Sequence, residues 1–256
     1  MPLLADTPLG MPTLPPNVEL VVVPDPQELG RRAADRLADL LARRPAAVLA
    51  LPTGRSPLPL YEEVTRRARK GLIDLTSTTI FALDEYRGLF RHDASSCFSF
   101  LRRHLLAGVR VGRVFAFDGQ AADPAAECRR YESALAEAGG LDLAVLGIGR
   151  NGHLALNEPG SPFDSRTRPV SLADETRADQ AWLFDDPSRL PRGGLTMGLG
   201  TLMEARAVLL LASGAAKADI LSIALTGPVT ESVPASVLQR HTRVTVIAEE
   251  AAAPRL

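Results

Sequence analysis

Short apolar runs alternate along the chain with longer segments whose apolar residues recur every three or four positions. The runs predict buried strands and the longer segments predict helices, because a buried strand is apolar throughout and a helix on one face. The predicted strands cover residues 18–23, 46–51, 78–83, 113–117, 141–149, 205–213 and 242–248. The predicted helices cover residues 26–44, 58–71, 97–108, 124–140 and 214–227.

This alternation predicts an α/β fold with a doubly wound, mostly parallel sheet and helices on both faces. Neither an internal repeat nor a change of composition marks a second folded unit. We therefore predict a single domain over residues 18–256, preceded by a proline-rich tail over residues 1–17. The chain has 256 residues, of which 46% are hydrophobic, and this is enough for one large core.

Composition excludes several classes of function. A formal net charge of −1 does not indicate a nucleic acid or an anionic membrane as partner. Cys97 and Cys128 lie far apart, and the four histidines show no metal-ligand spacing, so neither a metal nor a disulfide framework is expected. The N-terminal segment lacks the pattern of a secretory signal, and no apolar run is long enough to span a membrane. We expect a soluble, cytoplasmic protein and leave a homo-oligomer open.

Polar residues that could bind a ligand or catalyse a reaction follow the ends of several predicted strands. In a parallel α/β sheet, ligands bind outside the carboxyl ends of the strands. The polar loops at such ends are PTGRSP (52–57), DEYRG (84–88) and GIGRNGHLALNEPG (147–160). We expect these loops to converge on one ligand site.

Residues 147–152 also match the G-x-G-x-x-G pattern of dinucleotide-binding folds. That pattern requires a helix to open at its third glycine, here Gly152. Pro159 and Pro162 leave room for barely two helical turns, and no strand ending in an acidic residue follows at the usual distance. The context therefore contradicts a dinucleotide site. A tight turn with a surface histidine is the simple alternative, whereas Asn151, His153 and Glu158 together favour a catalytic loop.

Several stretches make the chain similar to the glucosamine-6-phosphate deaminase (isomerase) family. They are LPTGRSPLPLY, FALDEYRGL, DLAVLGIGRNGHLALNEPGSPFDSRTR, LTMGLGTLMEARAVLLLASGAAKA and GPVTESVPASVLQRH. The resemblance runs from about Val21 to Val246. The related 6-phosphogluconolactonases share the fold and the Gly-His pair but lack the Asn-Glu-Pro segment. The resemblance implies conversion of an aminosugar phosphate and water to a ketose phosphate, fructose 6-phosphate, and ammonia, without a cofactor.

The resemblance also implies roles for particular residues. Asp84 would move a proton from C2 to C1 of the open-chain sugar, although a carboxylate there also suits a helix cap or a turn. His153 would transfer the proton that opens the sugar ring, since imidazole titrates near neutral pH. Glu158 and Asn151 would orient His153. The family often has Asp in place of Asn151, so the imidazolium should be held less strongly here.

A phosphate site is expected at the first of these loops. Thr53, Gly54, Arg55 and Ser56 follow a strand, and Ser56 should be the N-cap of the next helix, whose N-terminus attracts anions. Lys217 matches the family's phosphate-binding lysine, although it also suits a solvated surface.

The chain departs from the family at Trp182, which stands where the family has a second phosphate-binding arginine. Arg55 stands where the family usually has Gly or Ser, and we hypothesise that it supplies the missing charge. The rival hypothesis is that Trp182 stacks on an unphosphorylated or differently substituted sugar. Further candidates for substrate contacts are Glu85 and Gly152.

Two other functions stay open on the sequence alone. A 6-phosphogluconolactonase-type hydrolase would use His153 to activate water and would leave Asp84 without a role. A sugar-phosphate-binding protein without catalysis is compatible with Asn151 and Trp182, but not readily with the joint presence of Asp84, His153 and Glu158.

Overall fold

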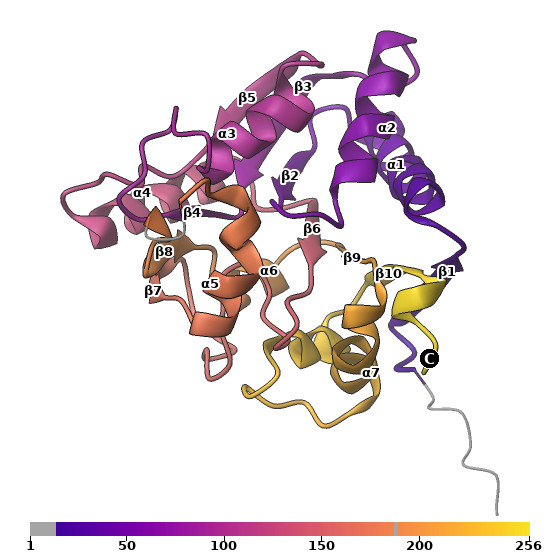
Figure 1. Ribbon diagram of the computed structural model, residues 1–256. Coiled ribbons are helices and arrows are strands. Elements are labelled where there is room, and N and C mark those ends of the chain that lie inside the picture. The colour runs from indigo at the N-terminus through magenta and orange to yellow at the C-terminus, as the bar shows by residue number, and fades with distance from the viewer. Residues whose placement is uncertain (1–13, 187–188) are drawn as a thin grey trace, which may run out of the picture.

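The computed structural model describes residues 14–186 and 189–256, so residues 1–13 of the predicted tail lie outside the described part. Within this part, seven strands form one sheet in the order β1-β10-β9-β6-β2-β3-β5, and all neighbouring strands run parallel (Figure 1). The strands are β1 (Val18–Val23), β2 (Val48–Leu51), β3 (Leu75–Ala82), β5 (Val111–Phe115), β6 (Leu143–Gly147), β9 (Val208–Ala212) and β10 (Val244–Glu249). The predicted parallel α/β sheet is confirmed.

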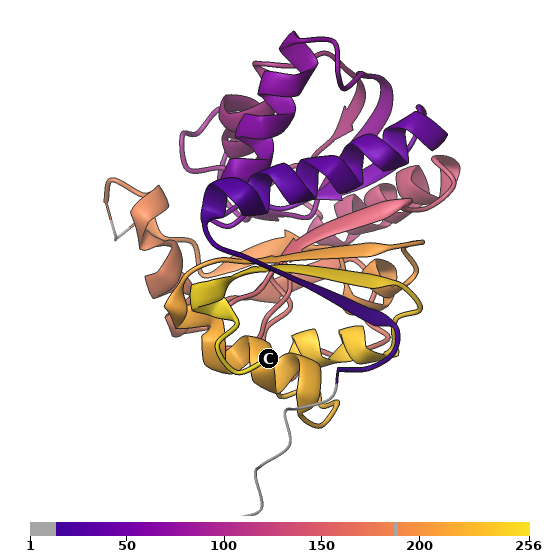
Figure 2. The ribbon, with the colours of Figure 1, turned by 90° about the vertical axis from the view of Figure 1, so that its right-hand side faces the viewer.

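Helices cover both faces of this sheet (Figure 2). They are α1 (Pro26–Arg43), α2 (Leu58–Arg69), α3 (Cys97–Leu101), α4 (Pro124–Glu137), α5 (Asp174–Gln180), α6 (Leu199–Met203) and α7 (Ala218–Thr226). The apolar faces of α1, α2 and α3 share one buried cluster with Leu49 and Leu211, while α4, α6 and α7 share another with Ala50 and Leu210. Alternate residues of each strand therefore point into opposite cores, which explains the continuous apolar runs. None of the described helices is long and apolar enough to cross a membrane.

A small antiparallel sheet lies beside the large one and was not predicted. It joins β4 (Asp84–Tyr86), β8 (Gly193–Thr196) and β7 (Arg168–Ser171). The sequence-based interpretation of DEYRG as a loop is therefore wrong for its first three residues. The pairing of Asp84 with Thr196 joins segments more than a hundred positions apart, so local pattern could not reveal it. Its consequence is that Asp84 sits on a paired strand rather than in a free loop.

Another difference concerns the helix predicted over residues 97–108. The α-helix ends at Leu101 and continues as a π-helical turn, Arg102–Leu106. The remaining predicted strands and helices agree with the structure apart from their end residues.

Candidate active site

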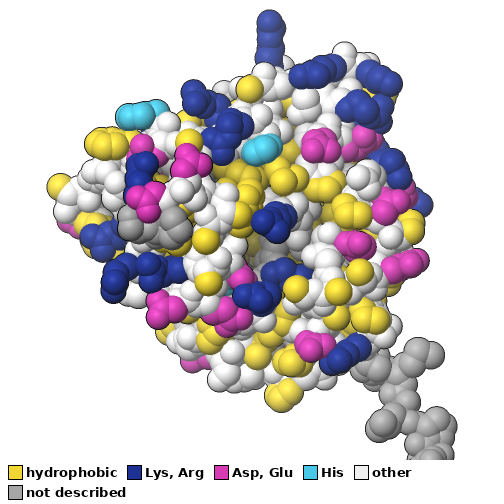
Figure 3. Space-filling model, viewed as in Figure 1, with side chains coloured by type: hydrophobic (Ala, Val, Ile, Leu, Met, Phe, Trp, Pro, Cys, Tyr) yellow, Lys and Arg dark blue, Asp and Glu magenta, His cyan; other side chains and the backbone are white. Residues whose placement is uncertain are grey.

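The three strand-end loops converge, as expected, on one cavity of about 660 Å³. The β2 loop contributes residues 52–57, the 84–88 segment contributes Asp84 and Tyr86, and the β6 loop contributes residues from 147 to 156. A fourth segment, the turn after β9, adds residues between 213 and 217. Asp84 and His153 both line this cavity. Figure 3 shows the molecule hollowed near the middle of this face, with Lys and Arg side chains around the hollow. A cavity of this size and charge suits an anionic ligand the size of a sugar phosphate.

Asp84 is the first residue of β4 and lies two positions after the end of β3. Its side chain is almost fully buried, with 6% of the residue exposed. Burial raises the pKa of Asp84 from 3.8 to about 6, and a hydrogen bond from the Cys97 thiol opposes this rise. The carboxyl group is thus ionised at neutral pH and still basic enough to accept a proton.

Glu85 points away from the cavity and does not line it. Its carboxylate accepts hydrogen bonds from the backbone N–H groups of Tyr86, Cys97 and Phe98, at 2.9, 2.9 and 3.0 Å. Burial nevertheless raises the pKa of Glu85 to about 7. The geometry gives Glu85 a structural task, which is to tie β4 to the start of α3.

His153 depends on the glycines around it. Gly152 adopts a φ of +86°, a left-handed conformation that favours glycine. A Cβ on Gly149 would lie 2.2 Å from the His153 ring, so the ring can pack there only because Gly149 has no side chain. The turn is closed by a hydrogen bond of 3.0 Å from the Gly149 N–H to the His153 carbonyl. No helix begins at Gly152, where turns and bends continue to residue 160, so this segment lacks the helix that a dinucleotide fingerprint requires.

A chain of hydrogen bonds orients the imidazole. The Asn151 side-chain oxygen lies 2.8 Å from His153 Nδ1, and the Asn151 amide donates to Glu158 Oε2 at 2.8 Å. Because an amide oxygen can only accept, Nδ1 carries the proton and Nε2 keeps its lone pair. Glu158 is held in turn by the Ala173 N–H at 3.2 Å. Asn151, Glu158 and Gly152 thus lie behind His153 rather than in the cavity lining.

The protonation state of His153 follows from its surroundings. Burial lowers its pKa, and the charge of Lys217 lowers it further, while Glu158, 3.8 Å from Nδ1, opposes the change. The imidazole is therefore neutral at neutral pH and can act as a base through Nε2.

Asn157 is a site residue that the sequence interpretation missed. It is fully buried, and its amide donates to the carbonyls of Leu154 and Met197 at 3.0 and 2.8 Å. Its side-chain oxygen accepts from Arg168 on β7 at 2.7 Å. Asn157 thereby connects the 147–160 loop to the small sheet. Its place in the Asn-Glu-Pro segment was the available signal.

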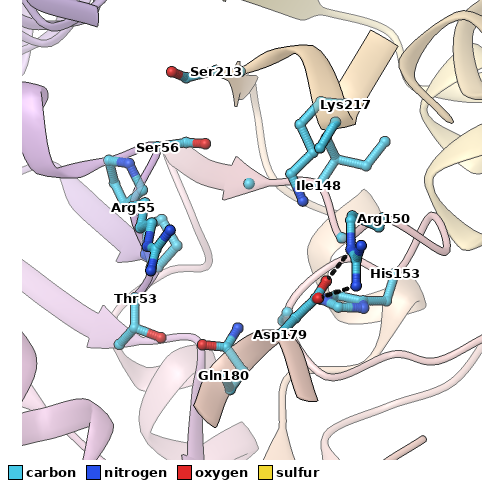
Figure 4. Close-up of a pocket in the computed structure, with 18 of the residues that line it drawn as sticks. Thr53, Arg55, Ser56, Ile148, Arg150, His153, Asp179, Gln180, Ser213 and Lys217 are labelled. Atoms are coloured by element: carbon cyan, nitrogen blue, oxygen red, sulfur yellow. Dashed lines mark hydrogen bonds and ion pairs between the residues drawn. The ribbon is translucent and has the colours of Figure 1, made fainter. Parts of the chain in front are cut away.

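The expected anion-binding residues all line the cavity. Thr53, Gly54, Arg55 and Ser56 lie on one side, and Figure 4 shows Lys217 extending its amine into the cavity from the opposite side. Burial lowers the pKa of Lys217.

The expectation that Ser56 caps α2 is wrong. Pro57 is the N-cap residue, and it makes no side-chain cap bond. A turn precedes the helix, closed by the Leu58 N–H donating to the Arg55 carbonyl at 3.2 Å. The Ser56 hydroxyl is thus left facing the cavity, where Figure 4 shows it.

Arg150 and Asp179 also line the cavity and were not singled out from the sequence. The Arg150 guanidinium donates twice to the Asp179 carboxylate, with Nε 2.8 Å from Oδ2 (Figure 4). Trp182, at the cavity mouth, lies under the Arg55 guanidinium, whose Cζ is 4.9 Å from the ring centroid. Among residues 14–186 and 189–256, no group of His, Cys, Asp or Glu side chains is arranged to hold a metal ion.

Comparisons with known proteins agree with this geometry. Residues 25–247 match the family model of glucosamine-6-phosphate isomerases and 6-phosphogluconolactonases. Glucosamine-6-phosphate deaminases of Arthrobacter sp. (strain FB24) and Cutibacterium acnes are each 46% identical over 241 residues. These alignments cover 93% of this chain and 93% and 92% of the relatives.

Solved structures give the same result. The chain superimposes on a monomeric glucosamine-6-phosphate deaminase with a TM-score of 0.89 and 36% identity, covering 93% of this chain and 100% of that one. It also shares the fold of the Trypanosoma brucei 6-phosphogluconolactonase, with a TM-score of 0.76, 21% identity and coverage of 95% and 100%. The chain therefore belongs to the family of glucosamine-6-phosphate isomerases and 6-phosphogluconolactonases.

Proposed function

We propose that this chain converts glucosamine 6-phosphate and water to fructose 6-phosphate and ammonia. The observation that supports this most directly is that Asp84 and His153, from different strand ends, line one cavity with Lys217 and Arg55. A buried base, an oriented imidazole and cations for a phosphate are the groups that this reaction needs. Relatives named glucosamine-6-phosphate deaminase are 46% identical to this chain over almost its whole length.

The first step is opening of the pyranose ring. His153 Nε2 takes the proton of the C1 hydroxyl, the C1–O5 bond breaks, and the imidazolium returns the proton to O5. This gives the open-chain aldehyde. Asn151 and Glu158 keep Nδ1 protonated throughout, so Nε2 always faces the sugar oxygens.

The second step is proton transfer along the carbon chain. Ionised Asp84 removes the proton from C2, which the neighbouring aldehyde makes acidic, while the substrate's 2-ammonium group gives a proton to O1, and this forms an enolamine. Asp84 then returns its proton to C1, which leaves an iminium group at C2. Water adds to C2 and ammonia leaves, so that C2 becomes the ketone of fructose 6-phosphate. A carboxyl group with a pKa of about 6 suits both halves of this transfer.

Arg55 is the cation that we assign to the phosphate beside Lys217. Arg150 is already neutralised by Asp179, whereas none of the described carboxylates forms an ion pair with Arg55. A free guanidinium can bind a phosphate through parallel hydrogen bonds. Arg55→Ala should therefore raise KM for the 6-phosphate substrate at least tenfold, about 1.4 kcal/mol, and an unchanged KM would contradict the assignment.

The deciding experiment is a screen of ammonia release. Glucosamine, galactosamine and their 6-phosphates are compared, and acid release from 6-phosphogluconolactone is measured in parallel. We expect ammonia from glucosamine 6-phosphate alone or in preference, and no acid above the uncatalysed rate. Acid release without ammonia would favour the lactonase, and binding of the sugar phosphate without either product would favour a non-catalytic binding protein.

We further propose that the enzyme acts in the cytoplasm on a small aminosugar phosphate. A solved relative is described as monomeric, and we propose on that ground that one subunit of this chain likewise forms a complete cavity.

A further inference from the structure

Arg150 and Arg55, which both line the cavity, are held by one short segment in different ways. This segment comprises α5 and the 3-10 turn Ala181–Leu183 that follows it. Asp179 on α5 forms the double hydrogen bond to Arg150. Trp182 in the turn lies beneath the guanidinium of Arg55.

The two contacts leave the arginines in different states. An ion pair with Asp179 neutralises the charge of Arg150 and occupies N–H groups on its edge. A cation–π contact with an indole face is not a hydrogen bond to a carboxylate, so the N–H groups of Arg55 remain available to a ligand. Arg55 is thus both held in place and free to bind an anion.

Trp182 is itself held. Its ring meets the ring of Phe100 edge-on, with centroids 6.3 Å apart and an interplanar angle of 80°. Phe100 belongs to α3 and is buried in the core. The indole is 41% exposed at the mouth and carries Arg55, whose side chain is exposed and lacks a described carboxylate partner. Without the indole, the long Arg55 side chain would spread over many rotamers.

We propose that Trp182 is a positioning residue that fixes the Arg55 guanidinium as one wall of the phosphate site, facing Lys217. Position 182, where the family resemblance implies a second phosphate-binding arginine, thereby acts through Arg55 of the β2 loop. The indole face is occupied by Arg55 and is not a stacking platform for the sugar. This inference rests on the proposed function in taking a 6-phosphate as the ligand group.

The chain contains a single tryptophan, so its intrinsic fluorescence reports on this contact directly. Titration with inorganic phosphate, and separately with glucosamine 6-phosphate, should change the emission of the wild type in a saturable way. Arg55→Ala should shift the emission before ligand is added and raise the half-saturating concentration at least tenfold. Arg113→Ala is the control, because it removes another arginine–aromatic contact, 5.8 Å from Phe115, on the distant edge strand β5.

Kinetics test whether Trp182 acts through Arg55. Trp182→Ala should raise KM about three- to tenfold with kcat unchanged within about twofold, the range of a partly desolvated cation–π contact. Trp182→Phe should restore most of the affinity, since it keeps an aromatic face. In the Arg55→Ala background, Trp182→Ala should have little further effect on KM.

The outcomes separate the inference from the proposed function. An equal increase of KM in both backgrounds would mean that Trp182 contacts the substrate itself, and this overturns the inference. A loss of kcat in Trp182→Ala would overturn it as well. If the wild type releases no ammonia, the proposed function fails. The inference is then still tested by the coupling between Arg55 and Trp182 in phosphate affinity, measured by calorimetry.

Discussion

Replacement of Asp84 by Asn should stabilise the folded protein while it abolishes turnover. The pKa of the buried carboxyl rises from 3.8 to about 6 on folding. Since one pKa unit corresponds to about 1.4 kcal/mol, ionised Asp84 should destabilise the fold by about 3 kcal/mol above pH 7. A neutral amide of nearly the same shape avoids this penalty. The same substitution should lower kcat by about 10²- to 10⁴-fold, the range for loss of a general base.

The sign of the pH dependence makes the prediction specific. An acid whose pKa is raised by folding favours the folded state fully only below its unfolded pKa, and this contribution is lost as pH rises through about 6. The gain in free energy of unfolding from Asp84→Asn should therefore fall to about 1.6 kcal/mol at pH 5, half its value above pH 7. The activity of the wild type should follow the opposite course, with kcat/KM rising through a pH of about 6 as the base ionises.

The measurement is urea unfolding of wild type and variant at intervals between pH 5 and pH 8. Asp174→Asn is the matched control, because the Asp174 side chain is 96% exposed and makes only a surface ion pair with Arg177. Its difference from the wild type should stay within about 0.5 kcal/mol at every pH. A difference between wild type and Asp84→Asn that is equally independent of pH would refute the assignment of a buried carboxylate with a raised pKa at this position.

Other predictions concern the remaining parts of the site. Gly149→Ala should lower kcat by about 10²-fold, because the new Cβ displaces the His153 ring; full activity in this variant would show that the ring position is not needed. Asn151→Asp should raise the pKa of His153, since it puts a negative charge at the atom 2.8 Å from Nδ1; imidazole NMR titration measures this, and an unmoved titration counts against direct orientation. Lys217→Ala should raise KM about tenfold or more with a smaller change in kcat, and steady-state kinetics in which only kcat falls would exclude a phosphate role.

The parts of the site that could be predicted are those encoded by short stretches of sequence. Each core strand is apolar on both faces and ends in polar residues, so the convergence of the 52–57 and 147–160 loops followed from parallel-sheet geometry. The relation of Asn151 and Glu158 to His153 lies within one loop. Such local relations are visible without tertiary structure.

The unpredicted parts all depend on distant pairings. β4 has only three residues, and its partner β8 contributes a single large apolar side chain, Leu195, so neither shows a strand pattern of its own. α5 is short and mostly polar, and nothing in its periodicity indicates that Asp179 reaches Arg150. The charge of Arg55 was noticed from the sequence, but its support by Trp182 requires the two segments to meet across the cavity mouth.

The cavity is divided into a dry part and a charged part, and the division accounts for its chemistry. Asp84 and His153 are both more than nine-tenths buried, and burial moves the pKa of Asp84 up and that of His153 down. The two shifts have opposite directions, so that a neutral imidazole and an ionised carboxylate coexist near pH 7. The cations stay at the mouth, where Arg55 is exposed and Lys217 is half-buried. Burial and the Cys97 thiol, not the charges of Arg55 or Lys217, set the pKa of Asp84. Substrate affinity and base strength can therefore be adjusted by different residues.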